Sequence, residues 1–214
     1  TSEEKDARVL TYDASIATRK TTLGAGLAVT FDGVDDEADT PDVGDFTFGD
    51  GAADFPFSVV ALVNVTDTAS PRSILSKDVA TTGATQREWE FQIGSDDTLG
   101  FYLWDDSAAA RLLQYSTITQ AAWRLFAGTY DGSRASTGIK IWDNGLVIAM
   151  SVSNTGTYVA MENSTALVRL GANIPAGGAV SNFFSGSMAF VGLFAKQLTA
   201  DEMWALKTLV NAFF

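Results

Sequence analysis

Residues 123–148, WRLFAGTYDGSRASTGIKIWDNGLVI, say more about the fold than any other stretch of the chain. Residues 123–130 are almost continuously apolar and rich in β-branched and aromatic side chains, which is typical of a strand covered on both faces. The DGS sequence at 131–133 ends that strand. Two further apolar runs flank Asn144-Gly145, a pair that accepts the positive φ angles of a tight hairpin turn. The stretch therefore predicts three strands joined by two turns.

Similar strand patterns recur along the rest of the chain, separated by clusters of Gly, Asp, Asn, Ser and Thr. Many short strands with this spacing predict an all-β fold, a two-sheet antiparallel jelly-roll sandwich. A chain of 214 residues is long enough for one sizeable core. We expect a polar N-terminal tail or arm at residues 1–8 and a single domain at 9–214. The expected strands are 9–12, 27–31, 57–65, 72–76, 88–93, 99–104, 112–116, 123–130, 139–142, 146–151, 166–170 and 186–195.

Only the C-terminal end has the pattern of a helix. Thr199 and Glu202 have the spacing of a capping box, and Met203 and Leu206 begin an apolar series at helical spacing. We therefore expect one short C-terminal α-helix. The final pair, Phe213-Phe214, is apolar where a terminus is usually polar. It is expected either to pack back on the sandwich or to bury against a neighbouring subunit.

The overall charge and composition exclude several classes of function. The net charge is −12, from 26 acidic and 14 basic residues, and the basic residues form no cluster. We therefore expect no binding to nucleic acid, whose phosphates such a chain repels. No apolar run approaches the roughly 18 residues that span a bilayer, so we expect no membrane insertion. The N-terminal residues also lack the apolar core of a signal peptide.

The chain contains neither histidine nor cysteine. Disulfides, thiolate metal sites and cysteine nucleophiles are therefore absent. The lack of histidine also excludes a Ser-His-Asp triad, most zinc sites and the commonest general base near neutral pH. A hard cation held by oxygen atoms remains compatible with this composition.

An acidic run extends over residues 32–54, and the next basic residue is Arg72. Calcium takes about six to eight oxygen ligands and tolerates irregular loop geometry, so the FDGVDD segment at 31–36 is a possible structural calcium site. Its ligands would include Asp32, Asp35 and Asp36. The segment lacks the spacing of an EF-hand loop, and a solvated acidic loop is the alternative interpretation.

Several motifs, taken in order, resemble one known family. They are FDGVDD at 31–36, FSVVALVNV at 57–65, ILSKD at 74–78, WRLFAGTYDGS with IKIWDNG after it, and FSGSMAFVGLFAKQLTADEMWAL at 184–206. Together they resemble the laminin G-like, concanavalin A-like lectin-glucanase jelly-roll family over roughly residues 9–209. The resemblance implies two antiparallel sheets with one concave face, and binding of glycans or proteins, often outside the cell and with a structural calcium. The family's acidic loop falls on Asp32 and Asp35, whereas Glu37-Ala38 replaces an aromatic residue that commonly follows.

Some enzymes with this sandwich hydrolyse glycans with a Glu-x-Asp-x-Glu strand, and the segment Glu88-Trp89-Glu90-Phe91-Gln92 is the nearest match. Strict alternation along a strand predicts that Glu88, Glu90 and Gln92 share one face. An amide replaces the third acid, so an ordinary outer strand is the favoured interpretation.

Sugar binding requires aromatic faces with polar neighbours on one surface. Tyr102, Trp104 and Trp142 are the candidates, and Tyr102 and Trp104 alternate onto one face of their strand. If the turn at 94–98 pairs this strand with 88–93, then Glu88, Glu90 and Gln92 complete a glycan groove. The alternative is that the aromatic side chains belong to the core.

The sequence as a whole indicates a non-catalytic recognition or adhesion module that binds glycan or a protein surface, displayed outside the cell or on a particle. An alternative is a structural decoration or surface subunit of a virion or similar assembly. Such a subunit would assemble as a homo-oligomer or larger array through the N-terminal arm and Phe213-Phe214. A glycoside hydrolase is the third interpretation.

Overall fold

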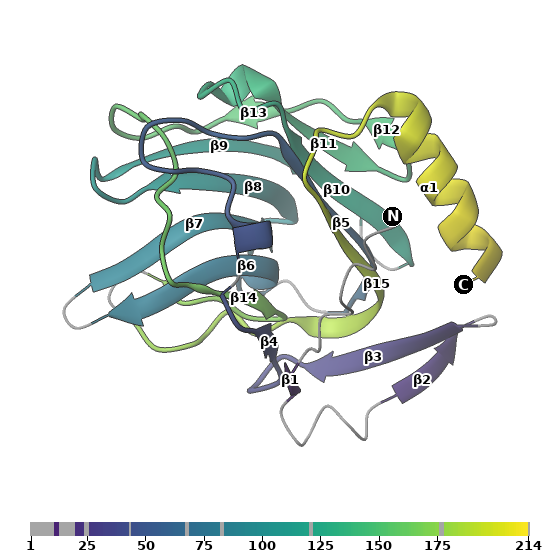
Figure 1. The fold of residues 1–214 in the computed structure, drawn as a ribbon. Coiled ribbons are helices and arrows are strands. Elements are labelled where there is room, and N and C mark those ends of the chain that lie inside the picture. Colours follow the sequence, from purple (N-terminus) through teal and green to yellow (C-terminus); the bar gives the residue numbers. More distant parts are fainter. Residues whose placement is uncertain are drawn as a thin grey trace, which may run out of the picture.

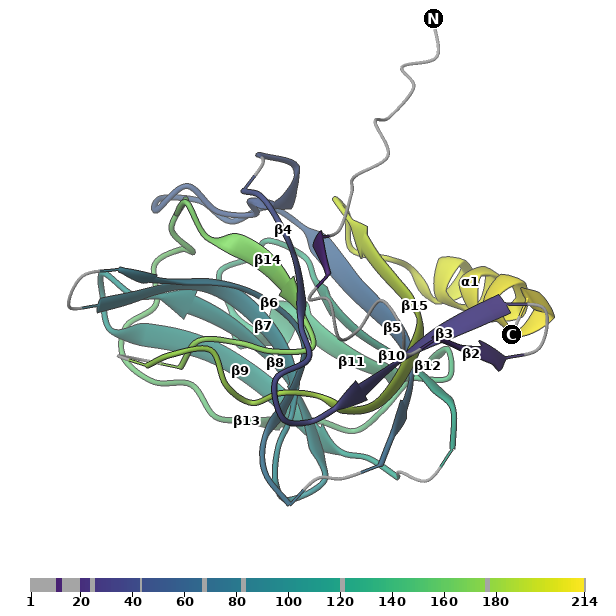
Figure 2. The same ribbon diagram turned by 90° about the horizontal axis from the view of Figure 1, so that it is seen from below.

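The structure is a computed structural model that describes residues 11–12, 20–23, 26–42, 44–66, 69–81, 84–119, 122–175 and 178–213. Two antiparallel sheets pack face to face, and α1 (Ala200–Phe213) lies on the outer side of one of them (Figures 1 and 2). The predicted jelly-roll sandwich with one C-terminal helix is therefore confirmed. None of the helices in the described ranges is long and apolar enough to cross a membrane.

One sheet, called sheet A, has eight strands in the order β1-β4-β14-β6-β7-β8-β9-β13. Its centre is a meander from β6 to β9, in which each strand pairs with the next along the chain. The turn at residues 94–97 pairs Ile93 with Leu99, as the sequence predicted. The strands of sheet A are β1 (Thr11–Tyr12), β4 (Ala38–Thr40), β6 (Arg72–Thr81), β7 (Ala84–Ile93), β8 (Thr98–Asp105), β9 (Ala110–Thr117), β13 (Ser151–Val152) and β14 (Leu167–Leu170).

The other sheet, called sheet B, has seven strands in the order β12-β11-β10-β5-β15-β3-β2. Asn144 and Gly145 have φ angles of 49° and 81°, which makes the β11–β12 connection the tight turn predicted from the sequence. The strands of sheet B are β2 (Lys20–Leu23), β3 (Gly26–Asp32), β5 (Phe57–Val65), β10 (Arg124–Tyr130), β11 (Ile139–Asp143), β12 (Leu146–Val147) and β15 (Ser185–Phe194). Two 3₁₀ turns complete the fold, η2 (Gly44–Phe46) and η3 (Ser136–Gly138).

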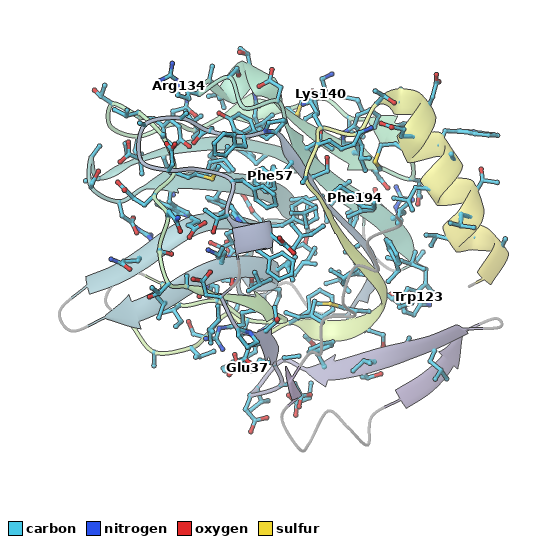
Figure 3. The ribbon with its side chains drawn as sticks, in the orientation of Figure 1. Glu37, Phe57, Trp123, Arg134, Lys140 and Phe194 are labelled. Carbon is cyan, nitrogen blue, oxygen red and sulfur yellow. The ribbon has the colours of Figure 1, made fainter. Side chains whose placement is uncertain are left out.

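The main core fills the space between the two sheets and is dominated by aromatic rings. Phe57 lies between the sheets (Figure 3) and stacks on Phe48 with 4.2 Å between ring centroids. Phe57 also contacts Trp89 and Phe101 of sheet A at centroid distances of 5.8 and 5.3 Å. Because these rings reach from one sheet to the other, they fix which side of each strand is the inner face.

A second apolar cluster lies on the outer side of sheet B, under α1. Met203 and Val210 of the helix pack there with Val60, Leu125 and Trp142 of the sheet. The helix begins at the predicted capping box, in which the Glu202 amide donates to the Thr199 hydroxyl at 3.3 Å and Glu202 accepts from the Thr199 amide at 2.9 Å. The amphipathic pattern of the helix thus positions it as a cover for sheet B.

Two expectations about strands are wrong. The segment 146–151 is not one strand, because the chain leaves sheet B after β12 and enters sheet A at β13. Ile148 and Met150, which lie between these strands, turn toward the main core.

The acidic run also contains a strand, β4, in which Ala38 and Thr40 are buried and Asp39 alone is partly exposed. Basic residues distant in sequence approach the run, since Arg169 pairs with Glu37 and Lys77 lies 3.2 Å from Asp42.

Candidate functional site

The outer face of sheet A, the face turned away from sheet B, carries most of the polar and aromatic side chains that the sequence singled out. Trp89, Phe91 and Ile93 of β7 point into the main core, as do Leu99, Phe101 and Leu103 of β8. The alternate residues therefore point outward. Four of the predicted binding residues lie on this outer face, namely Glu90, Gln92, Tyr102 and Trp104.

Glu88 is the exception, and the prediction that it shares a face with Glu90 is wrong. Asp78 pairs with Arg87 and Lys77 pairs with Trp89, so Glu88 occupies a β-bulge with no partner of its own. Its carboxylate turns to the inner side, where it accepts bonds from the Lys77 ammonium at 2.6 Å and the Ser164 hydroxyl at 2.7 Å. Glu88 is therefore a buried structural residue.

The same bulge brings Arg87 to the outer face, next to the predicted aromatic residues. The guanidinium carbon of Arg87 lies 3.6 Å from the centroid of the Trp104 ring. Trp104 and Tyr102 are nearly parallel, with an interplanar angle of 8° and centroids 6.0 Å apart. Arg111, which pairs with Trp104 across β8 and β9, lies 5.3 Å from the same ring. We call Arg87, Tyr102, Trp104 and Arg111 the outer-face cluster.

A glycine allows the Tyr102 ring to lie against the sheet. A Cβ atom at Gly100 would stand 2.6 Å from Cε2 of Tyr102, closer than real contacts allow. The ring therefore lies over Gly100, two residues before it on the same face of β8. Burial and the neighbouring Glu90 carboxyl raise the pKa of Tyr102 to about 12, so its hydroxyl remains a hydrogen-bond donor at neutral pH.

The connection from β14 to β15 covers the part of the outer face over β6 and β7. Ser76 donates to the Ala172 carbonyl at 3.0 Å, and the Asn173 side chain donates to Glu90. Burial and the nearby Asp78 carboxylate raise the pKa of Glu90 to about 8. Glu90 is thus mainly protonated at neutral pH. It is buried beneath the β14–β15 connection, whereas the four side chains of the outer-face cluster are partly exposed.

A polar cavity of about 380 Å³ lies beside the outer-face cluster and shares Arg87 with it. Arg87 is held at the cavity wall by Asp106, which accepts from its Nη2 at 2.7 Å and from its backbone amide at 2.7 Å. The remaining walls come from residues 86, 107 and 162–164. The cavity offers carboxylate, amide and hydroxyl groups to a polar ligand.

Trp142 is not part of this site. Its ring is 3% exposed and packs in the second apolar cluster, between sheet B and α1. Its indole nitrogen donates to Thr129 Oγ1 at 3.0 Å. The core alternative therefore holds for Trp142, whereas Tyr102 and Trp104 point away from both apolar clusters.

The structure brings together the three predicted metal ligands. One carboxylate oxygen from each of Asp32, Asp35 and Asp36 lies within 4.8 Å of the other two. Asp36 is buried and accepts a bond from the Asp32 amide at 2.8 Å, and Gly33 allows the loop to turn with a φ of 80°. Three converging hard oxygens suit Ca²⁺, which these residues would hold with loop carbonyls. Calcium binding stays a prediction.

The residues predicted to drive assembly fall outside what the structure describes. The N-terminal arm at 1–8 and Phe214 lie outside the described ranges, and the side chain of Phe213 is not described either. The assembly role therefore also stays a prediction.

Arg87 and Arg111 were not among the residues predicted from the sequence. Arg111 could have been predicted, because a short turn after β8 places β9 antiparallel and brings Arg111 opposite Trp104. Arg87 could not, because strict alternation places it with the core residue Trp89. Only the bulge at Glu88, which forms around the buried Lys77–Glu88 pair, reverses that assignment.

Comparison with known proteins identifies the sandwich. A family model described as the concanavalin A-like lectin/glucanases superfamily matches residues 32–203. No curated protein matches the sequence.

Solved structures with the same fold include a botulinum neurotoxin serotype G binding domain, with a TM-score of 0.68 and 9% identity over 98% of this chain. This chain spans 48% of that domain, about half its length. The CBM40 of a Ruminococcus gnavus IT-sialidase has a TM-score of 0.58 and 20% identity, over 73% of this chain and 84% of that one. The same CBM40 bound to α2,3-sialyllactose has a TM-score of 0.56 and 21% identity, with the same coverage.

Proposed function

Because the chain belongs to the concanavalin A-like lectin/glucanase superfamily, we propose that it is a non-catalytic carbohydrate-binding module whose ligand lies on the outer face of sheet A. One observation carries this proposal. Two nearly parallel aromatic rings, Tyr102 and Trp104, lie partly exposed on a sheet face that no helix of the described ranges covers (Figure 2). An apolar ring surface next to hydrogen-bonding groups suits a sugar, which has C–H faces and a hydroxyl rim.

The surroundings of the rings supply the polar part of such a site. Arg87 and Arg111 lie beside the two rings, and the Tyr102 hydroxyl is available as a donor. The neighbouring cavity adds Asp106, Glu162 and other polar side chains within the same region. Because the Arg87 guanidinium already lies over one face of the Trp104 ring, a sugar would bind against the exposed parts of Tyr102 and Trp104, where it would have both an apolar contact surface and orienting hydrogen bonds.

The structural neighbours also support the proposal of carbohydrate binding. One is described as a carbohydrate-binding module of a sialidase and was solved with sialyllactose, and others are described as receptor-binding domains of toxins. Their TM-scores of 0.56 and 0.68 establish a shared fold, but at identities of 9–21% the fold alone is shared, so the proposed ligand rests on this chain's own residues.

The positions of the two glutamates of β7 support the proposed non-catalytic role. Glycosidases of this type place two carboxyl groups on either side of one glycosidic bond, about 5 to 10 Å apart in an open site. Here Glu88 turns inward to Lys77 and Ser164, whereas Glu90 lies on the outer face and is held by Asn173. Because the strand separates them, they cannot act together on one bond.

The proposal is tested by a glycan array followed by calorimetric titration of the best ligand. We expect Trp104→Ala to weaken binding at least tenfold, since it removes the stacking surface, while the melting temperature stays close to that of the wild type. Trp204→Ala is the matched control, because Trp204 is 65% exposed on α1, on the opposite side of the molecule. Silence on the array, or equal binding by the Trp104 variant, contradicts the proposal.

A further inference from the structure

Arg111 differs from every other arginine that the structure describes. Within the described ranges, its guanidinium donates no hydrogen bond and has no carboxylate within 4 Å, and its Nε is buried without a partner. The remaining described arginines each donate to an acceptor: Arg72 to Phe183, Arg87 to Asp106, Arg124 to Asp143, Arg134 to Ala52 and Arg169 to Glu37.

The chain is acidic, with 26 acidic residues against 14 basic ones. Three of the six described arginines, Arg87, Arg124 and Arg169, form ion pairs with carboxylates. Leaving a guanidinium half-buried and unpaired costs free energy, because water solvates it poorly there. Contacts with the faces of Tyr102 and Trp104, at 5.6 and 5.3 Å, offset part of this cost but satisfy none of its N–H donors.

Two carboxyl groups near the outer-face cluster do not neutralise Arg111. Glu90 faces the same region, but burial and the Asp78 carboxylate keep it mainly protonated at neutral pH. Asp106 is occupied by Arg87, from which it accepts one bond from the guanidinium Nη2 and one from the backbone amide, each at 2.7 Å. The outer-face cluster therefore carries an excess positive charge on a protein whose net charge is −12.

We propose that the glycan bound by this domain carries a carboxylate group, which accepts a two-point hydrogen bond from the terminal nitrogens of Arg111 while its sugar ring packs against the exposed parts of Tyr102 and Trp104. The inference rests on the proposed function and specifies the class of its ligand. A planar guanidinium matches a carboxylate in shape and charge, and charge-assisted bonds of this kind are about twice as strong as neutral ones. The aromatic rings below hold the guanidinium plane in place, which reduces the entropy lost on binding.

The experiment compares acidic sugars with the same sugars after their charge has been removed. The probes are sialyllactose, a hyaluronan tetrasaccharide and a tetragalacturonate, each as the free acid and as its methyl ester, and sulfated lactose. We expect at least one free acid to bind and its methyl ester to bind about 10- to 100-fold more weakly, as expected for a hydrogen bond to a charged group. Sulfated lactose distinguishes a carboxylate site from a site for any anion, and stronger binding of the sulfate overturns the assignment.

Single-residue variants test whether Arg111 is the side chain that recognises the carboxylate. Arg111→Gln is expected to bind acid and ester equally weakly, and Arg111→Lys to recover only part of the preference because it lacks the planar fork. Lys140→Gln removes the same charge from an exposed position on β11 of sheet B (Figure 3) and is expected to change nothing. Retained preference for the acid in Arg111→Gln overturns the inference.

The two proposals fail in different ways. If neutral glycans bind as well as acidic ones and depend on Trp104, the carbohydrate-binding function stands and the role of Arg111 is wrong. If no glycan of either kind binds to the folded protein, both proposals are wrong.

Discussion

The two outer faces of the sandwich have opposite characters, although both belong to the same kind of antiparallel sheet. The outer face of sheet B is apolar and covered, since Val60, Leu125 and Trp142 pack beneath α1. The outer face of sheet A carries Gln92, Tyr102, Trp104 and the two arginines, and the one α-helix that the structure describes lies away from it (Figure 2). One outer face therefore stabilises the fold, and the other is the face on which a ligand is proposed to bind.

Two tryptophans make the difference concrete. Trp142 and Trp104 both lie on outer faces of strands, but the Trp142 nitrogen donates to Thr129 Oγ1 and the Trp104 nitrogen is buried without a partner. Buried polar groups in structural regions are normally satisfied. Two of the unsatisfied buried donors among the described residues, Trp104 Nε1 and Arg111 Nε, lie together on the outer face of sheet A, where a ligand is proposed to bind.

The largest expected effect is the loss of folding stability when a tryptophan is removed from one outer face rather than from the other. Trp142→Ala removes a nearly fully buried ring from beneath α1 and is expected to lower the free energy of unfolding by about 3–5 kcal/mol. Trp104→Ala, on the half-exposed face, is expected to cost about 1 kcal/mol. Urea unfolding followed by far-UV circular dichroism measures both, and equal losses would remove the distinction between the faces.

The next prediction concerns the buried carboxyl group under the outer face of sheet A. The pKa of Glu90 is raised from 4.5 to about 8 in the folded protein, so the folded state binds a proton more tightly than the unfolded state. Stability from this group is complete below about pH 4.5 and is lost as the pH rises to about 8.

We therefore expect Glu90→Gln to flatten the decline in stability between pH 5 and 8. Urea midpoints measured across that range test the expectation, with Glu202→Gln as the control. Glu202 lies on α1, and bonds from Lys196 and Thr199 lower its pKa to about 2, so its titration falls below this range. If the stability of Glu90→Gln falls with pH as steeply as that of the wild type, Glu90 is already ionised at pH 5.

A smaller effect is expected at the hairpin beside α1. Gly145 has a φ of 81° and faces the Lys207 side chain and the Met203 carbonyl of the helix. An alanine there is forced into the left-handed region, which costs about 1–2 kcal/mol. Thermal unfolding of Gly145→Ala measures the cost. The matched position Gly44 has open space around it and no positive φ, so Gly44→Ala is expected to change the melting temperature little.

The smallest effect is expected at the loop that joins the two sheets. Asp32 ends β3 of sheet B, and Asp36 lies just before β4 of sheet A. If the three aspartates bind Ca²⁺ with a Kd on the order of 1 mM, 5 mM Ca²⁺ adds about 1 kcal/mol of stability, a rise in melting temperature of about 2–4 °C. Asp35→Asn should abolish that rise, and a melting temperature unaffected by Ca²⁺ and by EDTA would rule the site out.

Much of the fold was predictable because it depends on local patterns. The expected strand at 57–65 coincides with β5, and the primed turn at Asn144-Gly145 and the capping box at Thr199 also form as predicted. The site was only partly predictable. Tyr102 and Trp104 were identified from alternation alone, whereas Glu88 and Trp142 were placed with them wrongly.

Each error has a tertiary cause. Glu88 turns inward because a bulge lets it pair with Lys77, a residue on another strand. Trp142 is covered because α1, about 60 residues further along the chain, returns to pack on it. Neither the alternation of a single strand nor its composition contains information about such distant partners.

The sequence by itself determined the sandwich, its hairpins and its closing helix, because hydrophobic periodicity, turn residues and caps act between neighbours in the chain. It also determined what chemistry is missing, since a chain without His or Cys cannot supply those side chains. Only the tertiary structure decided which outer face is covered and which arginine is left without a partner. Those properties depend on burial and on charges brought together from distant strands, so they exist only once the two sheets have packed.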